Sequence, residues 1–397
     1  MRPLSCAAAC ALIFPCLFTI ASEAQAASSK ARALDVDLYK RLAADTGNFM
    51  ISAPSLKDAL GIVYLGARGK TAKEMAAVLG FSADASAEAS ALKKDEESWK
   101  TSAGGAELAI ANRLWVDSSA PLEAGFVEKV NAAWEAGVES IDFMKGWEPS
   151  RDLINAWVAK QTRDKISTLL EKGSITSETR LVIANAIYFN GKWSSSFPLQ
   201  ATRDRDFYVD GKDAQAVPTM FQASNFRFAS FDGGEVLELP YAKSSLAMDL
   251  FLPDDNAGLA KLESRLSSGA IASWTKKLVK QHVAVTLPKF SFSSGGSLSK
   301  LLQEMGMKES FTSRADFSGA TSHPSGLQVT DVIQKTWIAV DEVGTEATGA
   351  TGVVGAKRNG APGTVHFDID HPFIFAIRDT KTGKVLFLGR VTNPKRS

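Results

Sequence analysis

The chain has very little cysteine. Its three cysteines, Cys6, Cys10 and Cys16, all lie close to the first residue. The sequence beyond them therefore offers no disulfide bond, no thiolate nucleophile and no cysteine metal ligand. Without such a covalent link, the fold has to be held by an apolar core. A content of 45% hydrophobic and 22% charged residues is ordinary for a globular protein.

Histidine is scarce as well, and catalytic motifs are missing. The four histidines are His282, His323, His366 and His371, and none stands in an HExxH or HxH arrangement. This spacing argues against a histidine metal site. No Gly-x-Ser-x-Gly motif occurs either, so the sequence does not display the nucleophile and base of a hydrolase. We expect no metal, no cofactor and no enzymatic activity.

An excess of charge of one sign is also absent. The chain has 45 basic and 44 acidic residues and a formal net charge of +1, which gives no reason to expect nucleic acid as a partner. The short basic run from Lys276 to Lys280 is interpreted as the solvated end of a helix rather than as a phosphate-binding patch.

An apolar run of membrane-spanning length is missing too. The run from Ala7 to Ile20 has about fourteen residues, which is short for a hydrocarbon core of about 30 Å. It follows Arg2 and precedes Ala24-Gln25-Ala26, the order of a positive start, an apolar centre and a cleavage site in a secretory signal peptide. We therefore expect residues 1–26 to be a signal peptide, no membrane span, and a secreted or periplasmic protein.

Helical periodicity dominates the first half of the chain, and short strands dominate the second half. Helices are expected over 56–65, 71–79, 126–134 and 149–162, and strands over 108–116, 181–189 and 331–340. Ser52 is expected to cap the first helix, and Thr71 and Glu74 to form a capping box at the second. Residues 367–377 and 384–391 are expected to form a hairpin. Because strands and helices do not alternate strictly, the predicted fold class is α+β.

The stretch from Glu342 to Asn359 is unusual, since it has no charge between Ala347 and Ala356 and then ends in Lys357-Arg358-Asn359. Its glycines weaken it as the interior of a strand, and composition alone would suggest a flexible linker. With a period of two, however, one face carries only small or apolar residues. These residues are Thr345, Ala347, Gly349, Thr351 and Val353. The stretch could therefore enter an existing sheet without burying a charge.

Five segments, in the right order, resemble the serpin family of protease inhibitors over about residues 34–394. The most specific is FDIDHPFIF at 367–375, which is similar to the family's C-terminal signature. The others are LGARGKT at 65–71, NAIYFNGKW at 185–193, LPKF at 287–290 and DEVGTEA at 341–347. The resemblance implies three β-sheets with eight or nine helices in a single domain, residues 27–397, and an exposed reactive-centre loop at about 342–362.

The resemblance also implies roles for individual residues. The reactive bond would be Arg358–Asn359, with Lys357 as a secondary specificity residue. The hinge of the loop would consist of Glu342, Gly344, Thr345, Glu346, Ala347, Thr348, Gly349, Ala350 and Thr351. Ser52, Ser55, Asn185 and Gln334 would form the region where the sheet opens, and Trp193 would lie at the top of the sheet.

Two positions depart from the family's pattern. The usual Ser-Pro-x-Ser is replaced by Ser52-Ala53-Pro54-Ser55, and Gln334 stands where many members have histidine. Gln334 can donate and accept hydrogen bonds but cannot titrate. Gating by pH through that position is therefore not expected.

From these observations we expect a monomeric suicide inhibitor of a trypsin-like serine protease, or of a subtilisin-like protease that cuts after dibasic pairs. An arginine in an exposed loop suits a specificity pocket that holds a carboxylate. Scission after Lys357 or at Val354 is an alternative to scission after Arg358. The alternative function is a non-inhibitory, serpin-like binding or carrier protein.

Overall fold

The structure is a computed structural model. It describes residues 34–45, 47–134, 137–209, 211, 213–267, 269–323, 326–345 and 364–395. The predicted signal peptide, residues 1–26, lies outside these ranges, as do residues 346–363 of the predicted loop.

Helices are concentrated in the first half of the chain, as the periodicity predicted. The helix after Ser52 begins as expected, since the Ser52 hydroxyl caps it by accepting a hydrogen bond from the Ser55 amide at 3.3 Å. The described ranges contain α2 (Ala53–Tyr64), α3 (Gly69–Leu79), α4 (Ala85–Ala103), α5 (Ala124–Ala133), α6 (Trp147–Gln161), α7 (Leu259–Arg265), α8 (Ala270–Lys276) and α9 (Ser299–Glu304), and residues 34–42 are also helical.

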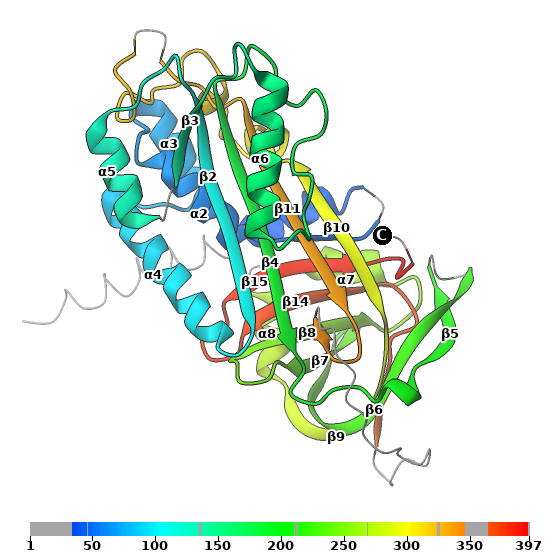
Figure 1. Ribbon diagram of the computed structural model, residues 1–397. Coiled ribbons are helices and arrows are strands. Elements are labelled where there is room, and N and C mark those ends of the chain that lie inside the picture. Colours follow the sequence, from blue (N-terminus) through cyan, green and yellow to red (C-terminus); the bar gives the residue numbers. More distant parts are fainter. Residues whose placement is uncertain are drawn as a thin grey trace, which may run out of the picture.

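A six-stranded sheet forms the front of the molecule (Figure 1). Its strands, in spatial order, are β10 (Phe290–Ser297), β11 (Asp331–Val340), β12 (Gly344–Thr345), β4 (Leu181–Lys192), β2 (Glu107–Asp117) and β3 (Val138–Ile141). The central β4 is buried along almost its whole length. Its sequence from Leu181 to Phe189, apolar apart from Asn185, agrees with a strand covered on both faces.

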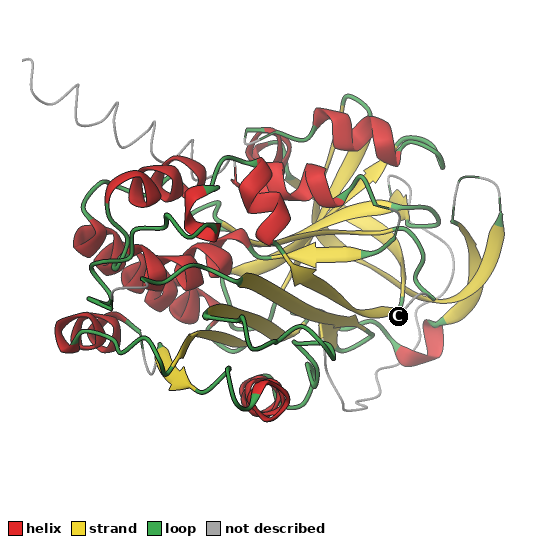
Figure 2. Ribbon diagram, turned by 90° about the horizontal axis from the view of Figure 1, so that it is seen from above, coloured by secondary structure: helices red, strands yellow, loops and turns green. Residues whose placement is uncertain are grey.

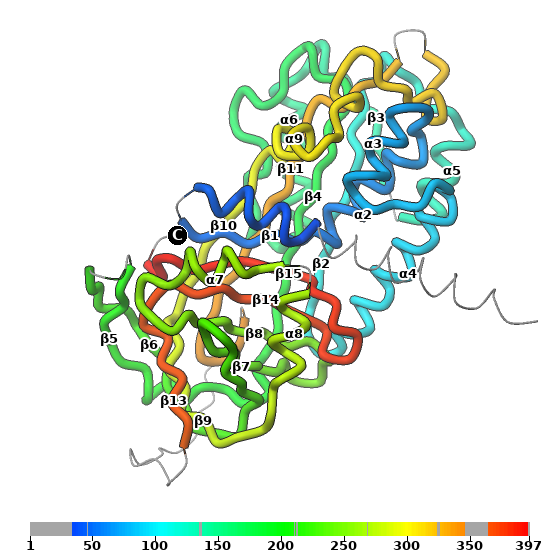
Figure 3. Tube along the Cα trace, turned by 180° about the vertical axis from the view of Figure 1, so that it is seen from behind, coloured from blue at the N-terminus to red at the C-terminus, as the bar shows by residue number. Residues whose placement is uncertain are grey.

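A nine-stranded sheet lies behind the first (Figure 3). Its strands run in the order β1 (Phe49–Ile51), β15 (Val385–Val391), β14 (Phe373–Asp379), β8 (Leu246–Pro253), β7 (Gly234–Pro240), β6 (Ala214–Phe231), β9 (Val279–Pro288) and β13 (Val365–Asp368), and β5 (Arg203–Tyr208) pairs with β6. The long β6 belongs to two parts of this sheet. Its first residues pair with β5, and its last residues pair with β7. The small third sheet, made of β5, β6, β9 and β13, is thus continuous with the second.

Apolar clusters cover both faces of the six-stranded sheet. On one face, Ile154 and Val158 of α6 pack against Trp115 and Val182. On the other face, aromatic side chains from both sheets share one cluster, which includes Phe189 of β4. In Figure 2 several helices are gathered at one end of the sheets. The expected α+β class and the helix content are confirmed.

Two local predictions are wrong. Thr71 and Glu74 do not form a capping box, because α3 already begins at Gly69. The Thr71 hydroxyl instead accepts from the Asp316 amide at 2.9 Å, and Glu74 accepts from the Lys308 amide at 2.8 Å.

The expected hairpin is also divided differently. Its first part is two strands, of which β13 pairs in parallel with β9 and only β14 pairs with β15. Pro372 lies between them, and a proline has no amide hydrogen with which to continue a ladder. The periodic pattern could not distinguish one long strand from two strands in different parts of a sheet.

Candidate functional site

The candidate site is the seam between β4 and β11 in the six-stranded sheet. The two strands pair directly and in parallel from Asp331 and Val182 to Trp337 and Tyr188. Above this point they separate, and β12 lies between them. Gly344 pairs with Lys192, and Thr345 pairs with both Gly191 and Val340. The first residues of the predicted hinge are thus already a strand of the sheet.

Glycine is the only residue type that fits at position 344 of β12. A Cβ atom at this position would lie 2.1 Å from the carbonyl oxygen of Gly191 and 2.8 Å from the Cα of Lys192. Both contacts are with backbone atoms, which cannot rotate away as a side chain can. The glycine is therefore required by close approach to β4.

Thr345 is held from inside the core. Its side chain is 1% exposed and its hydroxyl lies 2.7 Å from the hydroxyl of Tyr241. The Tyr241 ring stacks on Trp193, with ring centroids 4.9 Å apart and an interplanar angle of 14°. The predicted residue at the top of the sheet, Trp193, therefore supports the partner of the hinge threonine.

Glu342 is anchored although it lies only two residues before β12. It is 6% exposed, and its carboxylate accepts from Lys289 Nζ at 2.8 Å and from the Thr202 hydroxyl at 2.7 Å. Burial alone would raise the pKa of Glu342, but the hydrogen bonds from Lys289 and Thr202 outweigh burial and lower it. Its backbone carbonyl also accepts from the Phe197 amide at 2.8 Å.

A tight turn joins β11 to β12. The Asp341 carboxylate accepts from the amides of Val343 at 2.8 Å and Gly344 at 3.1 Å. Burial raises the pKa of Asp341 despite these bonds. Trp193 closes the turn from outside, since its indole Nε1 donates to the Asp341 carbonyl at 3.0 Å and its amide to the Val343 carbonyl at 2.9 Å.

Lower in the seam, the structure brings together the four residues predicted for the sheet-opening region. Gln334 and Asn185 are direct partners across β11 and β4, and Gln334 Nε2 donates to Asn185 Oδ1 at 2.5 Å. Gln334 also bonds to the backbone of Ser52, accepting from its amide at 3.1 Å and donating to its carbonyl at 2.9 Å. Asn185 Nδ2 donates to the Ser55 hydroxyl at 2.6 Å. All four side chains are at most 2% exposed.

Sequence reasoning missed the continuation of this cluster. Asn112, on the neighbouring β2, is the register partner of Asn185 and accepts a hydrogen bond from it. Asn112 donates in turn to the buried Asp58 of α2 at 2.6 Å. The sequence held two signals of this continuation. Asn112 and Asp58 are lone polar residues in apolar surroundings, the first in a predicted strand and the second three residues after Ser55. Tyr241 and Lys289 carried no comparable signal.

The remaining predicted site residues lie outside the described ranges. These are Glu346, Ala347, Thr348, Gly349, Ala350, Thr351, Lys357, Arg358 and Asn359. Within the described part of the chain, no helix combines the length and apolarity needed to cross a membrane. The same residues contain no group of three or more histidine, cysteine, aspartate or glutamate side chains arranged to hold a metal ion.

Comparison with known proteins gives a consistent result. The model of the family described as serpin (serine protease inhibitor) matches residues 29–394. Bovine leukocyte elastase inhibitor is 37% identical over 373 residues, covering 90% of this chain and 97% of the relative. Human serpin B3 is 33% identical, covering 90% and 97%. The solved structure of human thyroxine-binding globulin with thyroxine is 26% identical with a TM-score of 0.84, covering 93% and 99%.

These relatives contradict the expected location. Leukocyte elastase inhibitor and serpin B3 are intracellular serpins that lack signal peptides. The prediction of a secreted or periplasmic protein, which rested only on the composition of residues 1–26, is therefore wrong.

Proposed function

Because the chain belongs to the serpin family, whose members are mostly protease inhibitors and not catalysts, we propose that it inhibits a trypsin-like or dibasic-cutting serine protease by inserting its cleaved loop into the seam between β4 and β11. The observation that carries this proposal is the position of β12. It enters the seam antiparallel to both neighbours, so a continuation of this strand would run down the seam as β4 and β11 separate.

The register of β12 predicts where each loop residue would go. Thr345 faces Gly191 and Val340, so each further residue would pair one position earlier on both strands. Six steps on, Thr351 would lie between Asn185 and Gln334, which bond directly in the present structure. The side chains of Ala347, Gly349 and Thr351 would face the same side as Thr345. That side is the core around Tyr241, where small uncharged residues can be buried at little cost.

Inhibition would then proceed in defined steps. The hydroxyl oxygen of the protease serine attacks the carbonyl carbon of Arg358, the bond to Asn359 breaks, and the new amine of Asn359 leaves. The freed segment from Thr345 to Arg358 spans about 46 Å when extended at about 3.3 Å per residue. Its insertion would carry the acylated protease away from the site of cleavage before water can release it.

The test is to mix the full chain with trypsin and look for a complex that survives boiling in detergent. Replacing Lys357 and Arg358 together by alanine should abolish this complex, because no basic residue then remains at the predicted reactive bond. Thr351→Arg should turn the inhibitor into a substrate, because a charge would have to enter the core between Asn185 and Gln334. Clean cleavage after Arg358 without any stable complex would refute the proposal. With a dibasic-cutting protease, Lys357→Ala should slow complex formation much more than it does with trypsin.

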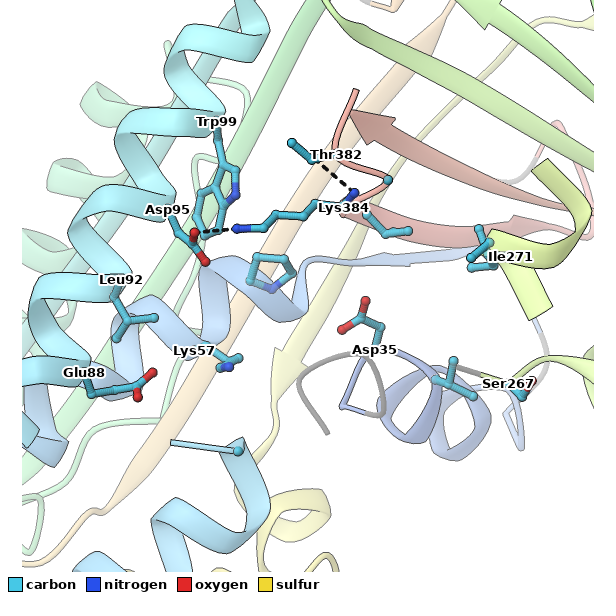
Figure 4. A pocket seen from close by; sticks show the side chains of 16 residues that line it. Asp35, Lys57, Glu88, Leu92, Asp95, Trp99, Ser267, Ile271, Thr382 and Lys384 are labelled. Carbon is cyan, nitrogen blue, oxygen red and sulfur yellow. Dashed lines mark hydrogen bonds and ion pairs between the residues drawn. The ribbon is translucent and has the colours of Figure 1, made fainter. Parts of the chain in front are cut away.

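A second candidate function, ligand carriage, is favoured by one cavity. A space of about 520 Å³ lies between residues 34–42, α2, α4, α8 and the turn before β15 (Figure 4). Among the described residues, the buried Trp99 Nε1 has no hydrogen-bond partner. Burial lowers the pKa of the neighbouring Lys57. A small amphipathic molecule with an acceptor group fits a lining that joins Lys57 and Lys384 to Leu92 and Ile271, and the structural neighbour thyroxine-binding globulin was solved with thyroxine. Thermal stabilisation by anilinonaphthalene sulfonate that is lost in Trp99→Phe would support carriage; equal stabilisation of both would refute it.

We also propose that residues 27–397 act as one domain and as a monomer. The apolar cluster shared by both sheets supports a single cooperative unit. Size-exclusion chromatography with light scattering should give the mass of one chain, and a concentration-dependent larger mass would contradict this.

A further inference from the structure

One series of side-chain hydrogen bonds continues from the seam into α2 with every donor on the same side. Gln334 Nε2 donates to Asn185 Oδ1 at 2.5 Å, and Asn185 Nδ2 donates to Asn112 Oδ1. Asn112 Nδ2 then donates to Asp58 Oδ2 at 2.6 Å. Each amide thus donates toward the next residue, and the series, called here the amide relay, ends at the Asp58 carboxylate. The relay crosses β11, β4, β2 and α2.

Both ends of the amide relay have a fixed polarity. At one end, Gln334 is held by the amide and the carbonyl of Ser52, which can only donate and only accept, respectively. At the other end, the indole Nε1 of Trp134 donates to Asp58 Oδ1 at 2.7 Å, and an indole nitrogen cannot accept. Neither Gln334 nor Trp134 can reverse its role. Only Asn112 and Asn185, between them, can rotate their amides.

Adding one proton to Asp58 introduces a conflict into this arrangement. The ionised carboxylate accepts from Trp134 and Asn112 together, whereas the protonated group carries a donor on one oxygen. Asn112 can adapt by rotating its amide so that its oxygen accepts from Asp58. Its amide nitrogen then faces the amide nitrogen of Asn185, which can rotate in turn. This rotation of Asn185 ends its donation to the Ser55 carbonyl, although the Ser55 hydroxyl can turn to donate instead. The next group, Gln334, cannot rotate, so the side-chain hydrogen bond that joins β11 to β4 is lost as well.

We propose that Asp58 is a pH-sensitive positioning residue that holds the β4–β11 seam closed when it is ionised and loosens the seam when it is protonated. The inference rests on the proposed function, because it concerns the regulation of the same seam. It gives the chain a titrating group that Gln334 does not provide. The titrating residue lies in α2, at the end of the amide relay.

The surroundings of Asp58 raise its pKa toward neutral pH. Its side chain is fully buried, and burial raises its pKa to about 7, with a smaller raising effect from Glu96 and lowering effects from the Trp134 and Asn112 hydrogen bonds and from Lys100. A cavity of about 250 Å³ beside it is lined by charged groups from α4 and β2. These are Glu96 and Lys100, paired at 2.6 Å, and Arg113. In the described part of the chain, the residue after α5, Trp134, and two residues of α6, Trp157 and Gln161, contribute uncharged groups to this lining.

The test is hydrogen exchange of the full chain, followed by mass spectrometry of peptides from β4 and β11 and corrected for the intrinsic exchange rate at each pH. Exchange in the seam should become about fivefold faster between pH 8 and pH 6, the factor expected for one lost hydrogen bond. In Asp58→Asn the exchange should be nearly equal at both pH values and close to the faster level. Retention of the wild-type pH dependence by Asp58→Asn would overturn the inference, as would equal exchange of the wild type at both pH values.

Two further variants keep the test decisive. Glu96→Gln removes the neighbouring carboxylate and should keep the pH dependence, because Glu96 is not part of the amide relay; a flat response would contradict the assignment to Asp58. Asn112→Ala keeps the Asp58 carboxylate but removes its hydrogen bond to the relay, so the exchange of the seam should not depend on pH; this variant serves if Asp58→Asn fails to fold. Trypsin is added in parallel. If exchange follows pH but no stable complex forms at any pH, the proposed inhibition is refuted while the role of Asp58 stands.

Discussion

Replacing Gly344 by alanine should expel β12 from the seam. The new Cβ would lie 2.1 Å from the Gly191 carbonyl oxygen and 2.8 Å from the Lys192 Cα, distances that side-chain rearrangement cannot relieve. We expect the strand to move out as a unit. The hydrogen bond between Thr345 and Tyr241 would then be lost as well.

The magnitude follows from two contributions. Forcing an extra carbon into a packed site costs about 1–3 kcal/mol, and the lost Thr345–Tyr241 hydrogen bond costs about 1 kcal/mol. Because the strand can escape the clash by leaving, the two costs replace rather than add to each other. We expect a loss of roughly 1–3 kcal/mol in the free energy of unfolding and a fall of a few degrees in melting temperature.

Three measurements check this prediction. The Trp193 amide, which donates to the Val343 carbonyl, should exchange faster, the melting temperature should fall, and trypsin should leave more cleaved product and less stable complex. Gly269→Ala is the matched control, because a Cβ there meets no atom within 4 Å. If Gly344→Ala behaved like Gly269→Ala in all three measurements, the reasoning about the required glycine would be wrong.

Three further predictions concern the partners of the seam. Tyr241→Phe should cost about 1–3 kcal/mol in chemical denaturation, since it leaves the buried Thr345 hydroxyl without its partner. Lys289→Met should destabilise the protein most near neutral pH, and the difference from wild type should shrink as the pH falls through the lowered pKa of Glu342, where that carboxylate becomes protonated. The pH dependence of stability that Asp58 causes has the opposite sign, because the pKa of Asp58 is raised. Relative to Asp58→Asn, the wild-type free energy of unfolding should fall as pH rises from about 4 to about 7 and then level off. Urea titrations at several pH values test both.

The sequence predicted the seam better than it predicted the supports of the seam. Asn185 and Gln334 could be placed because their strands were predicted from apolar runs and the serpin resemblance implied their role, and the small residues after Thr345 indicated that this stretch could enter a sheet. The anchor Lys289 and the stacked Tyr241 could not be placed, because their contacts depend on how two sheets meet. No local sequence pattern predicts that packing. The prediction of one strand through Pro372 was wrong for the same reason.

The described geometry also predicts an order of events for the proposed insertion. The upper part of the seam needs little change, because Gly344 and Thr345 already occupy it. The lower part is closed by direct pairing of β4 and β11 and by the bond between Gln334 and Asn185. In the proposed insertion, a loop residue would reach that level only after these strand pairs and this bond open, so we expect the barrier at the closed part of the seam rather than at the hinge. Changes at Gln334 should therefore alter the rate of the proposed insertion, and a charge introduced at Thr351 should slow the same step.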